Sequence, residues 1–194
     1  VEDSGYQDMT LSSLSTSDYP HLVELCDDLE DFCAQRHLTL ALPSLRADNF
    51  SMALMERLQK GRKTGLTFAP EAGTQRLRDA INKNLTEEDL LESCRRAFAG
   101  GYSAVKLYFM LGLPTETDED VLGIADIAAN VMHAWRESAV NKSRGVRITV
   151  STSWFVPKPH TAFQWEPQIP IEEYERRVKL LREAINTKSV TYNW

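Results

Sequence analysis

Polar and charged residues gather where five strand-like segments of the chain end. One of them, TFAPEAGTQR at residues 67–76, places Glu71 where a strand-like run passes into a helical pattern. The dipole of the following helix favours a carboxylate there, and a partly enclosed carboxylate also needs hydrogen-bond donors. A ligand carrying hydroxyl or ammonium groups would supply those donors. Glu71 is therefore a candidate ligand-binding residue, with helix electrostatics alone as the alternative explanation.

The other four segment ends have a similar character. They read SLSTSDY, PSLRAD, LGLPTETDED and FVPKPHTAFQW, and each sets polar or charged groups beside proline, glycine or a turn. Any single loop commonly contains such residues. Ligands of parallel α/β proteins, however, bind at the carboxyl ends of the strands, where these loops would meet. Taken together the five ends indicate a binding site.

Common cofactor and catalytic motifs are absent. The sequence contains no GxGxxG or GxxxxGK[ST] pattern, which argues against dinucleotide and P-loop binding, and no GxSxG nucleophile motif. His21 and Glu24 lie one helical turn apart, but two ligands do not make a metal site. No metal site is predicted from the residues present.

The elements that must position the strand ends alternate along the chain. Strands are expected at Met9–Ser15, Leu38–Leu42, Gly65–Ala69, Ala104–Leu111 and Val146–Phe155. Helices are expected at Pro20–Arg36, Ser51–Lys60, Thr74–Asn82, Thr86–Phe98, Thr117–Glu137 and Ile171–Asn186. Such alternation predicts a parallel sheet of βα units in an α/β fold.

Each of the later strands has one apolar and one polar face. Val105 and Leu107 alternate with Lys106 and Tyr108, and the segment from residue 147 alternates in the same way. Successive strand side chains point to opposite faces, so helices should cover one side of the sheet. The polar side predicts a ligand-holding interior of a partial TIM-like barrel. An open sheet with one solvent-facing side is the alternative.

Composition fits one globular domain over residues 1–194, with a Pro-rich loop near 156–170, a closing helix at 171–187 and a tail at 188–194. The net charge of -6 disfavours nucleic-acid binding, and no apolar run reaches the roughly 20 residues of a membrane helix. Three cysteines, Cys26, Cys33 and Cys94, are too few for a disulfide framework and lie on apolar helical stripes. We expect buried free thiols and a cytoplasmic location.

Three segments together resemble the radical S-adenosylmethionine (radical SAM) superfamily, in its iron–sulfur oxidoreductase branch. They are GLTFAPEAGTQRLRDAINKNLTEEDLLE, VKLYFMLGLPTETDEDVLGI and FVPKPHTAFQW, and the resemblance covers nearly the whole chain in order. It implies a partial (β/α)6 barrel with SAM across the carboxyl ends of the strands. It also implies a [4Fe–4S] cluster that cleaves SAM reductively to a 5′-deoxyadenosyl radical for hydrogen abstraction, with flavodoxin or ferredoxin as electron donor.

The sequence departs from the family pattern in lacking the CxxxCxxC loop that holds the cluster. Cys26 and Cys33 are separated by six intervening residues in an amphipathic helix and cannot replace it. The resemblance therefore implies a fragment that begins at the second strand of the family core and leads toward a missing C-terminal region. We expect this fragment to bind no cluster and to be inactive alone.

The resemblance also assigns roles to individual positions. Glu71 matches the residue that contacts the SAM ribose, with Lys83 near the SAM carboxylate and Arg76 and Arg78 as substitutes for it. The segment 12–15 matches the strand that contacts the SAM amino group, although serines stand where the family has an acid. The full set of expected cofactor contacts is Glu71, Lys83, Ser13, Ser15, Tyr108, Gly112 and Val156, and the expected substrate contacts are Arg46, Lys158 and His160.

Two other functions are consistent with the residues. Lys106 on the polar face could form a Schiff base in a metal-free barrel lyase or aldolase, because an interior lysine with a lowered pKa is a competent nucleophile. A non-catalytic barrel that acts as a scaffold is the third possibility. The sequence does not define the substrate.

Overall fold

A computed structural model describes residues 4–11, 19–41, 66–143 and 145–194. The strands are β1 (Asp8–Thr10), β2 (Thr39–Ala41), β3 (Leu66–Glu71), β4 (Ala104–Leu111), β5 (Arg147–Trp154) and β6 (Val190–Asn193). The helices are α1 (Leu22–Gln35), α3 (Gln75–Ala80), α4 (Glu87–Ala99), α5 (Asp118–Ser138) and α6 (Ile171–Ala184). The predicted helix at 51–60 lies outside the described residues.

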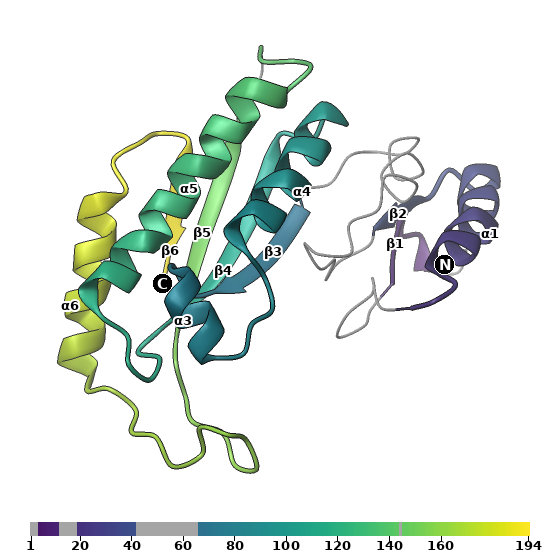
Figure 1. The fold of residues 1–194 in the computed structure, drawn as a ribbon. Helices are drawn as coiled ribbons and strands as arrows, with labels where there is room; N and C mark the ends of the chain where they lie inside the picture. The colour runs from purple at the N-terminus through teal and green to yellow at the C-terminus, as the bar shows by residue number, and fades with distance from the viewer. Residues whose placement is uncertain (1–3, 12–18, 42–65, 144) are drawn as a thin grey trace.

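The described strands form two parallel sheets. β1 pairs with β2, and a four-stranded sheet has the order β3-β4-β5-β6. Consecutive strands of the larger sheet are neighbours, as expected when a helix connects each strand to the next. Figure 1 shows α4, α5 and α6 together over one face of this sheet. The parallel α/β prediction and its partial-barrel class are confirmed.

The two faces of the larger sheet differ as the sequence predicts. On β4 the side chains of Val105, Leu107, Phe109 and Leu111 are at most 1% exposed and form the core with the helices. On the opposite face Lys106 is exposed and Tyr108 is 42% exposed. β5 repeats the pattern, with Ile148 and Val150 buried. The apolar face therefore fixes the register, because a slip of one residue would expose the core side chains.

Three helices of the larger unit begin at threonine caps. The Thr74 hydroxyl accepts a hydrogen bond from the Leu77 N–H at the start of α3. The predicted capping box at Thr86 is present, since Thr86 and Asp89 exchange side-chain and backbone hydrogen bonds. Thr117 and Asp120 form a second box at α5. Such caps satisfy amide groups that have no partner within the helix.

The observed bounds differ from the predicted ones at several ends. α1 begins at Leu22, two residues after the predicted start, and α6 ends at Ala184 rather than Asn186. The segment assigned to a tail contains β6, which adds to the sheet beside β5. A four-residue strand carries little periodic signal, so its pairing with β5 is decided by tertiary contact.

The three cysteines are free thiols buried in helices α1 and α4, as predicted. Burial raises the pKa of the Cys94 thiol to about 12. Among the described residues no helix is long and apolar enough to cross a membrane.

Candidate functional site

Glu71 lies at the carboxyl end of β3, where the strand becomes irregular. Phe68 pairs with Leu107 and Glu71 with Phe109, so three steps along β3 match two along β4. In a strand Thr67 and Glu71 lie on the same face, and the alternating burial of β3 continues to Glu71 despite this extra residue. Among the described residues β3 is an edge strand of its sheet, a position that accommodates Pro70 without an amide hydrogen. Thr67 and Glu71 are both half-buried, as expected for side chains on one face of the strand.

Glu71 and Lys83 come together in the structure. The Lys83 Nζ lies 3.6 Å from the Glu71 Oε1, and both side chains are about a third exposed. Burial raises the pKa of the Glu71 carboxyl, and the charge and hydrogen bond of Lys83 offset part of that rise. The two residues that the resemblance assigns to SAM thus form one loose ion pair that a ligand can reach.

Three non-glycine residues in the left-handed region follow the three long strands. Glu71 has a φ of 70° after β3, Thr115 a φ of 64° after β4 and His160 a φ of 61° after β5. Such conformations cost on the order of 1–2 kcal/mol each for residues with a Cβ, and they concentrate at binding and catalytic sites. Backbone strain therefore lies at the edge where the sequence places the site.

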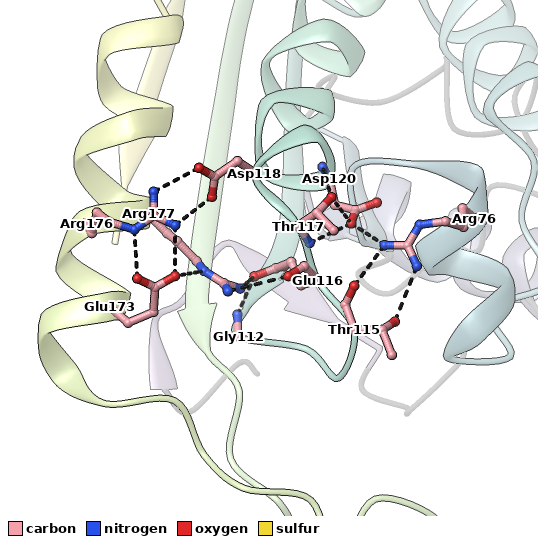
Figure 2. Close-up of polar contacts among 10 residues, drawn as sticks. All are labelled: Arg76, Gly112, Thr115, Glu116, Thr117, Asp118, Asp120, Glu173, Arg176 and Arg177. Carbon is pink, nitrogen blue, oxygen red and sulfur yellow. Dashed lines mark hydrogen bonds and ion pairs between the residues drawn. The ribbon is translucent and has the colours of Figure 1, made fainter.

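The turn after β3 is fixed against α5. A Cβ on Gly73 would lie 2.1 Å from the Asp120 carbonyl oxygen and 2.6 Å from the Ile124 amide nitrogen, so only glycine allows this approach. Beside it Thr74 donates to the Asp120 carboxylate, as does Arg76 (Figure 2). Gly73 and Thr74 thus hold the Glu71 turn in place by contact with the helix that follows β4.

Asp120 is the centre of this contact. Its side chain is 2% exposed and also accepts hydrogen bonds of 2.8 Å from the Thr117 amide and hydroxyl. Burial alone would raise the pKa of Asp120, but the hydrogen bonds from Thr74, Thr117 and Arg76 outweigh it and lower the pKa. Arg76 additionally donates to the Thr115 carbonyl at 3.0 Å. Its guanidinium is therefore already engaged within the protein.

Arg78, the other basic substitute, is a structural residue. It is 1% exposed and donates to the Leu85 and Ala72 carbonyl oxygens, both at 3.1 Å, and to the Gln75 amide oxygen. These bonds hold the α3–α4 connection against the turn after β3. Lys83 differs from both arginines: among the described residues its ammonium has a single contact, of 3.6 Å, and its side chain is 37% exposed. Arg76 is 53% exposed but donates to Asp120 and Thr115.

A second buried carboxylate organises the loop after β4. Glu116 accepts a hydrogen bond of 2.7 Å from the Gly112 amide and pairs with Arg177 of α6 (Figure 2). Burial raises the pKa of Glu116, and the Gly112 N–H and the Arg177 guanidinium offset part of the rise. Gly112 has a φ of 89°, and a Cβ there would lie 2.8 Å from the Ile169 side chain. Gly112 is therefore fixed by contacts within the protein.

The remaining predicted site residues lie at varied places. Val156 is 54% exposed in the loop after β5, and Lys158 and His160 are exposed further along it. Tyr108 lies on the polar face of the sheet as predicted. Ser13, Ser15 and Arg46 lie outside the described residues.

The polar face of the sheet encloses a concavity of about 620 Å³. Its lining comes from β3, β4, β5 and β6: Thr67, Ala104, Lys106, Tyr108, Arg147, Thr149, Ser151, Thr191 and Asn193. The polar face that the sequence predicts as a ligand-holding interior is thus hollowed in the structure. Glu71 is not among the lining residues, so the Glu71–Lys83 pair and the concavity are separate parts of the site.

Sequence reasoning missed Glu116 and Asp120, which connect the turns after β3 and β4. A usable signal was present for Asp120: Thr117 and Asp120 have the same threonine-to-acid spacing as the predicted box at Thr86 and Asp89. Nothing comparable marks Glu116, whose partner Arg177 lies 61 residues away.

Comparison with known proteins decides the family. A model of the radical SAM superfamily matches residues 1–128. The chain belongs to the radical SAM superfamily. A protein of Methanocaldococcus jannaschii named "Uncharacterized protein MJ0966" is 34% identical over 186 residues, which cover 94% of this chain and 37% of that protein. The chain therefore spans little more than a third of the length of this relative.

The residues present fit the two radical SAM cofactors unequally. Glu71 and Lys83 offer a half-buried acceptor and a donor at the strand ends, as a polar ligand requires. Among the described residues no three histidine, cysteine or acidic side chains are placed to hold a metal ion. Burial keeps the Cys94 sulfur protonated and out of contact with solvent, whereas cluster ligands must be thiolates. The described residues fit SAM and do not fit an iron–sulfur cluster.

Proposed function

We propose that this chain supplies the SAM-binding part of a radical SAM oxidoreductase that generates a 5′-deoxyadenosyl radical for hydrogen abstraction. The carrying observation is the pairing of Glu71 with Lys83 at the carboxyl edge of the strands, in a chain that belongs to this superfamily. When bound, SAM and a reduced [4Fe–4S] cluster would supply the radical chemistry. No cluster ligand is proposed from Cys26, Cys33 or Cys94.

The proposed work of Glu71 is to accept hydrogen bonds from the ribose hydroxyl groups. Burial raises the pKa of Glu71, and the Lys83 ammonium offsets part of that rise by favouring the charged, accepting form. The contact of 3.6 Å between Lys83 and Glu71 is loose. Lys83 is therefore proposed to leave Glu71 and to pair with the SAM carboxylate when SAM binds. Tyr108, Gly112 and Val156 are proposed to line the remaining SAM surface, with Ser13 and Ser15 at the amino group.

Substrate selection is proposed for the loop after β5 and for Arg46. Lys158 and His160 are exposed there, so they can meet a molecule that approaches the strand ends. We further propose a cytoplasmic protein that receives electrons from flavodoxin or ferredoxin. A lyase that uses Lys106 gains no support from the family, which acts without a Schiff-base lysine.

Substitution of Glu71 tests the cofactor assignment. In the protein at its full natural length, Glu71→Gln should weaken SAM binding by about 1–3 kcal/mol, the scale of a lost hydrogen bond to a charged group. Because burial raises the pKa of Glu71, SAM affinity should fall on acidification before an ordinary glutamate would titrate, and this fall should be absent in the variant. Isothermal titration calorimetry between pH 4.5 and 8 measures both.

The matched control is Glu119→Gln, an exposed acid in the first turn of α5 that should bind SAM like the unaltered protein. Equal SAM affinity in Glu71→Gln and Glu119→Gln would reject the role of Glu71. The reaction class is tested by anaerobic reconstitution with iron and sulfide. If neither an iron–sulfur absorbance band nor 5′-deoxyadenosine is formed under reductant, the radical SAM activity is rejected.

A further inference from the structure

The concavity on the polar face carries two positive charges. Lys106 lies on β4, and Arg147 is the first residue of β5. Their strands pair Ala104 with Arg147 and Lys106 with Thr149, so the two cations are diagonal neighbours on one face. With strands about 4.8 Å apart and a rise of about 3.3 Å per residue, their α-carbons are about 8 Å apart. Side chains of this length can converge on one small group between them.

None of the nine residues that line the concavity is acidic. Six of the other lining residues offer hydroxyl or amide groups: Thr67, Tyr108, Thr149, Ser151, Thr191 and Asn193. In a chain with 28 acidic and 22 basic residues, a hollow with only basic charges is a local reversal of the net sign. Such a site attracts anions and repels cations.

Both cations also lack an acidic partner among the residues that the structure describes. Their situation differs from that of the arginines at the helices, which form ion pairs with carboxylates: Arg76, Arg95, Arg96, Arg176 and Arg177. Two like charges that enter one hollow repel each other unless a counter-charge joins them. The free guanidinium and ammonium groups therefore face a hollow that is short of negative charge.

We propose that the concavity binds an oxyanion, a carboxylate or phosphate group of the substrate, between Lys106 and Arg147. The planar guanidinium of Arg147 can hold two oxygens of such a group, while Lys106 contributes a compact charge and the hydroxyls complete the shell. The proposal deepens the proposed function and rests on it, because it gives the substrate class of the radical SAM enzyme. It assigns Lys106 to substrate binding rather than to Schiff-base chemistry.

The position of the two cations also bears on substrate size. Lys106 precedes the end of β4 at Leu111 by five residues, which corresponds to about 16 Å of strand. Glu71 lies at the opposite, carboxyl edge of the sheet. A substrate anchored at Lys106 and Arg147 must therefore be elongated if its reacting carbon is to reach a SAM molecule at Glu71.

Binding of simple oxyanions tests the proposal without any cluster. Inorganic phosphate and malonate are titrated separately by calorimetry into the protein at its full natural length at low ionic strength, where charge attraction is least screened. At least one should bind saturably, and Lys106→Gln and Arg147→Gln should each raise its Kd about tenfold, as expected for loss of one charged hydrogen bond. Preference for phosphate or malonate distinguishes the two substrate classes.

The matched control is Lys142→Gln, which removes an exposed positive charge from the loop between α5 and β5 and should leave the Kd unchanged. Lys106→Arg and Arg147→Lys keep the charges and should retain most of the affinity. Circular dichroism melting checks folding, which these exposed side chains should affect little. Absence of saturable binding in the unaltered protein, or equal Kd values for Lys106→Gln, Arg147→Gln and Lys142→Gln, overturns the proposal.

The proposed function and this inference fail separately. Oxyanion binding does not depend on iron, sulfide or SAM. A protein that forms 5′-deoxyadenosine but binds neither probe retains the radical SAM function and loses the oxyanion site. A protein that binds phosphate through Lys106 and Arg147 but never cleaves SAM keeps the site and loses the reaction.

Discussion

At the scale of single residues, the charged side chains near the strand ends are of two kinds. Some are buried in hydrogen bonds and ion pairs within the protein, and others remain accessible to a ligand. Asp120 and Glu116 are almost completely buried and accept several hydrogen bonds each. Arg78 is buried with three acceptors. Glu71 and Lys83, by contrast, share one contact of 3.6 Å and remain about a third exposed. A ligand can bind only polar groups that it can reach, so the SAM-binding proposal rests on Glu71 and Lys83.

Glu173 provides a test of residue-scale electrostatics. Hydrogen bonds from Arg176 and Arg177 lower the pKa of Glu173 from 4.5 to about 2. A carboxylate with a depressed pKa stabilises the fold above its unfolded-state value, and this stabilisation is lost as pH falls from about 4.5 toward 2. Glu173→Gln should therefore lower the free energy of unfolding at pH 6 by about 1 kcal/mol, a modest value because solvent screens a partly exposed pair. The deficit should shrink on acidification.

Urea denaturation followed by circular dichroism between pH 2.5 and 6 measures that difference. Glu172→Gln is the control, since Glu172 is the exposed neighbour in the same first turn of α6 and should change stability by less than about 0.5 kcal/mol. A Glu173→Gln deficit that stays constant over this pH range would contradict the assigned cause.

At the scale of elements, the turn after β3 and the start of α5 act as one unit. Gly73 and Gly123 allow their backbones to touch, since a Cβ on Gly123 would lie 2.8 Å from the Gly73 carbonyl oxygen. Thr74 and Arg76 then reach Asp120. On the other side, Arg177 of α6 reaches Glu116 in the loop after β4. The position of Glu71 at the site is therefore determined by helices that follow it in sequence.

Gly73→Ala tests this contact between elements. The added methyl group would overlap with main-chain atoms of α5, which cannot move aside as a side chain could. We expect a loss of unfolding free energy of about 3 kcal/mol, the upper end for overpacked sites, together with weaker SAM binding because the Glu71 turn is displaced. Chemical denaturation and calorimetry measure the two effects.

Gly145→Ala is the matched glycine control. Its added Cβ would meet nothing within 4 Å, although the φ of 67° adds a conformational cost of about 1–2 kcal/mol. Gly145→Ala should therefore destabilise less than Gly73→Ala and leave SAM binding intact. If Gly73→Ala were no more destabilising than Gly145→Ala, the close approach of the two backbones would be refuted.

At the scale of the whole molecule, the four-stranded sheet separates a dry side from a polar side. The apolar face packs under α4, α5 and α6, as Figure 1 shows, and the opposite face holds the concavity with Lys106 and Arg147. Cys94 lies in this apolar part on α4, and Cys26 and Cys33 are buried on α1, at exposures of 0%, 1% and 4% respectively. Their chemistry therefore depends on opening of the fold.

Thiol labelling measures that opening. Burial raises the pKa of Cys94 to about 12 and also raises the pKa of Cys33, so neither is a reactive thiolate at pH 8. A short pulse of iodoacetamide followed by peptide mass spectrometry should leave all three largely unmodified in the native protein and modify all three in urea. The modification should rise with the unfolding transition. Rapid labelling of native Cys94 would contradict its place in the core.

The alternation of strands and helices and the two-faced character of β4 and β5 follow from the sequence alone. Their cause is local, since side-chain direction repeats every two residues in a strand and the capping box at Thr86 needs only residues within one turn. The choice of Glu71 and Lys83 also came from sequence, through family resemblance. Alternation along the strand also places Glu71 on the face of Thr67, and the alternating burial of β3 agrees with this despite its irregular pairing.

Only the tertiary structure decided which polar groups are free. The sequence does not distinguish charged residues that the protein itself uses, such as Arg76 and Glu116, from those left for a ligand, such as Lys83 and Arg147. Arg76 and Glu116 have partners 44 and 61 residues away, which the packing of α5 and α6 brings together, whereas Arg78 donates to nearby groups of the folded turns. β6 likewise exists because β5 offers it an edge to pair with. Sequence fixes local geometry through short-range periodicity, whereas availability for a ligand depends on contacts that chain folding alone creates.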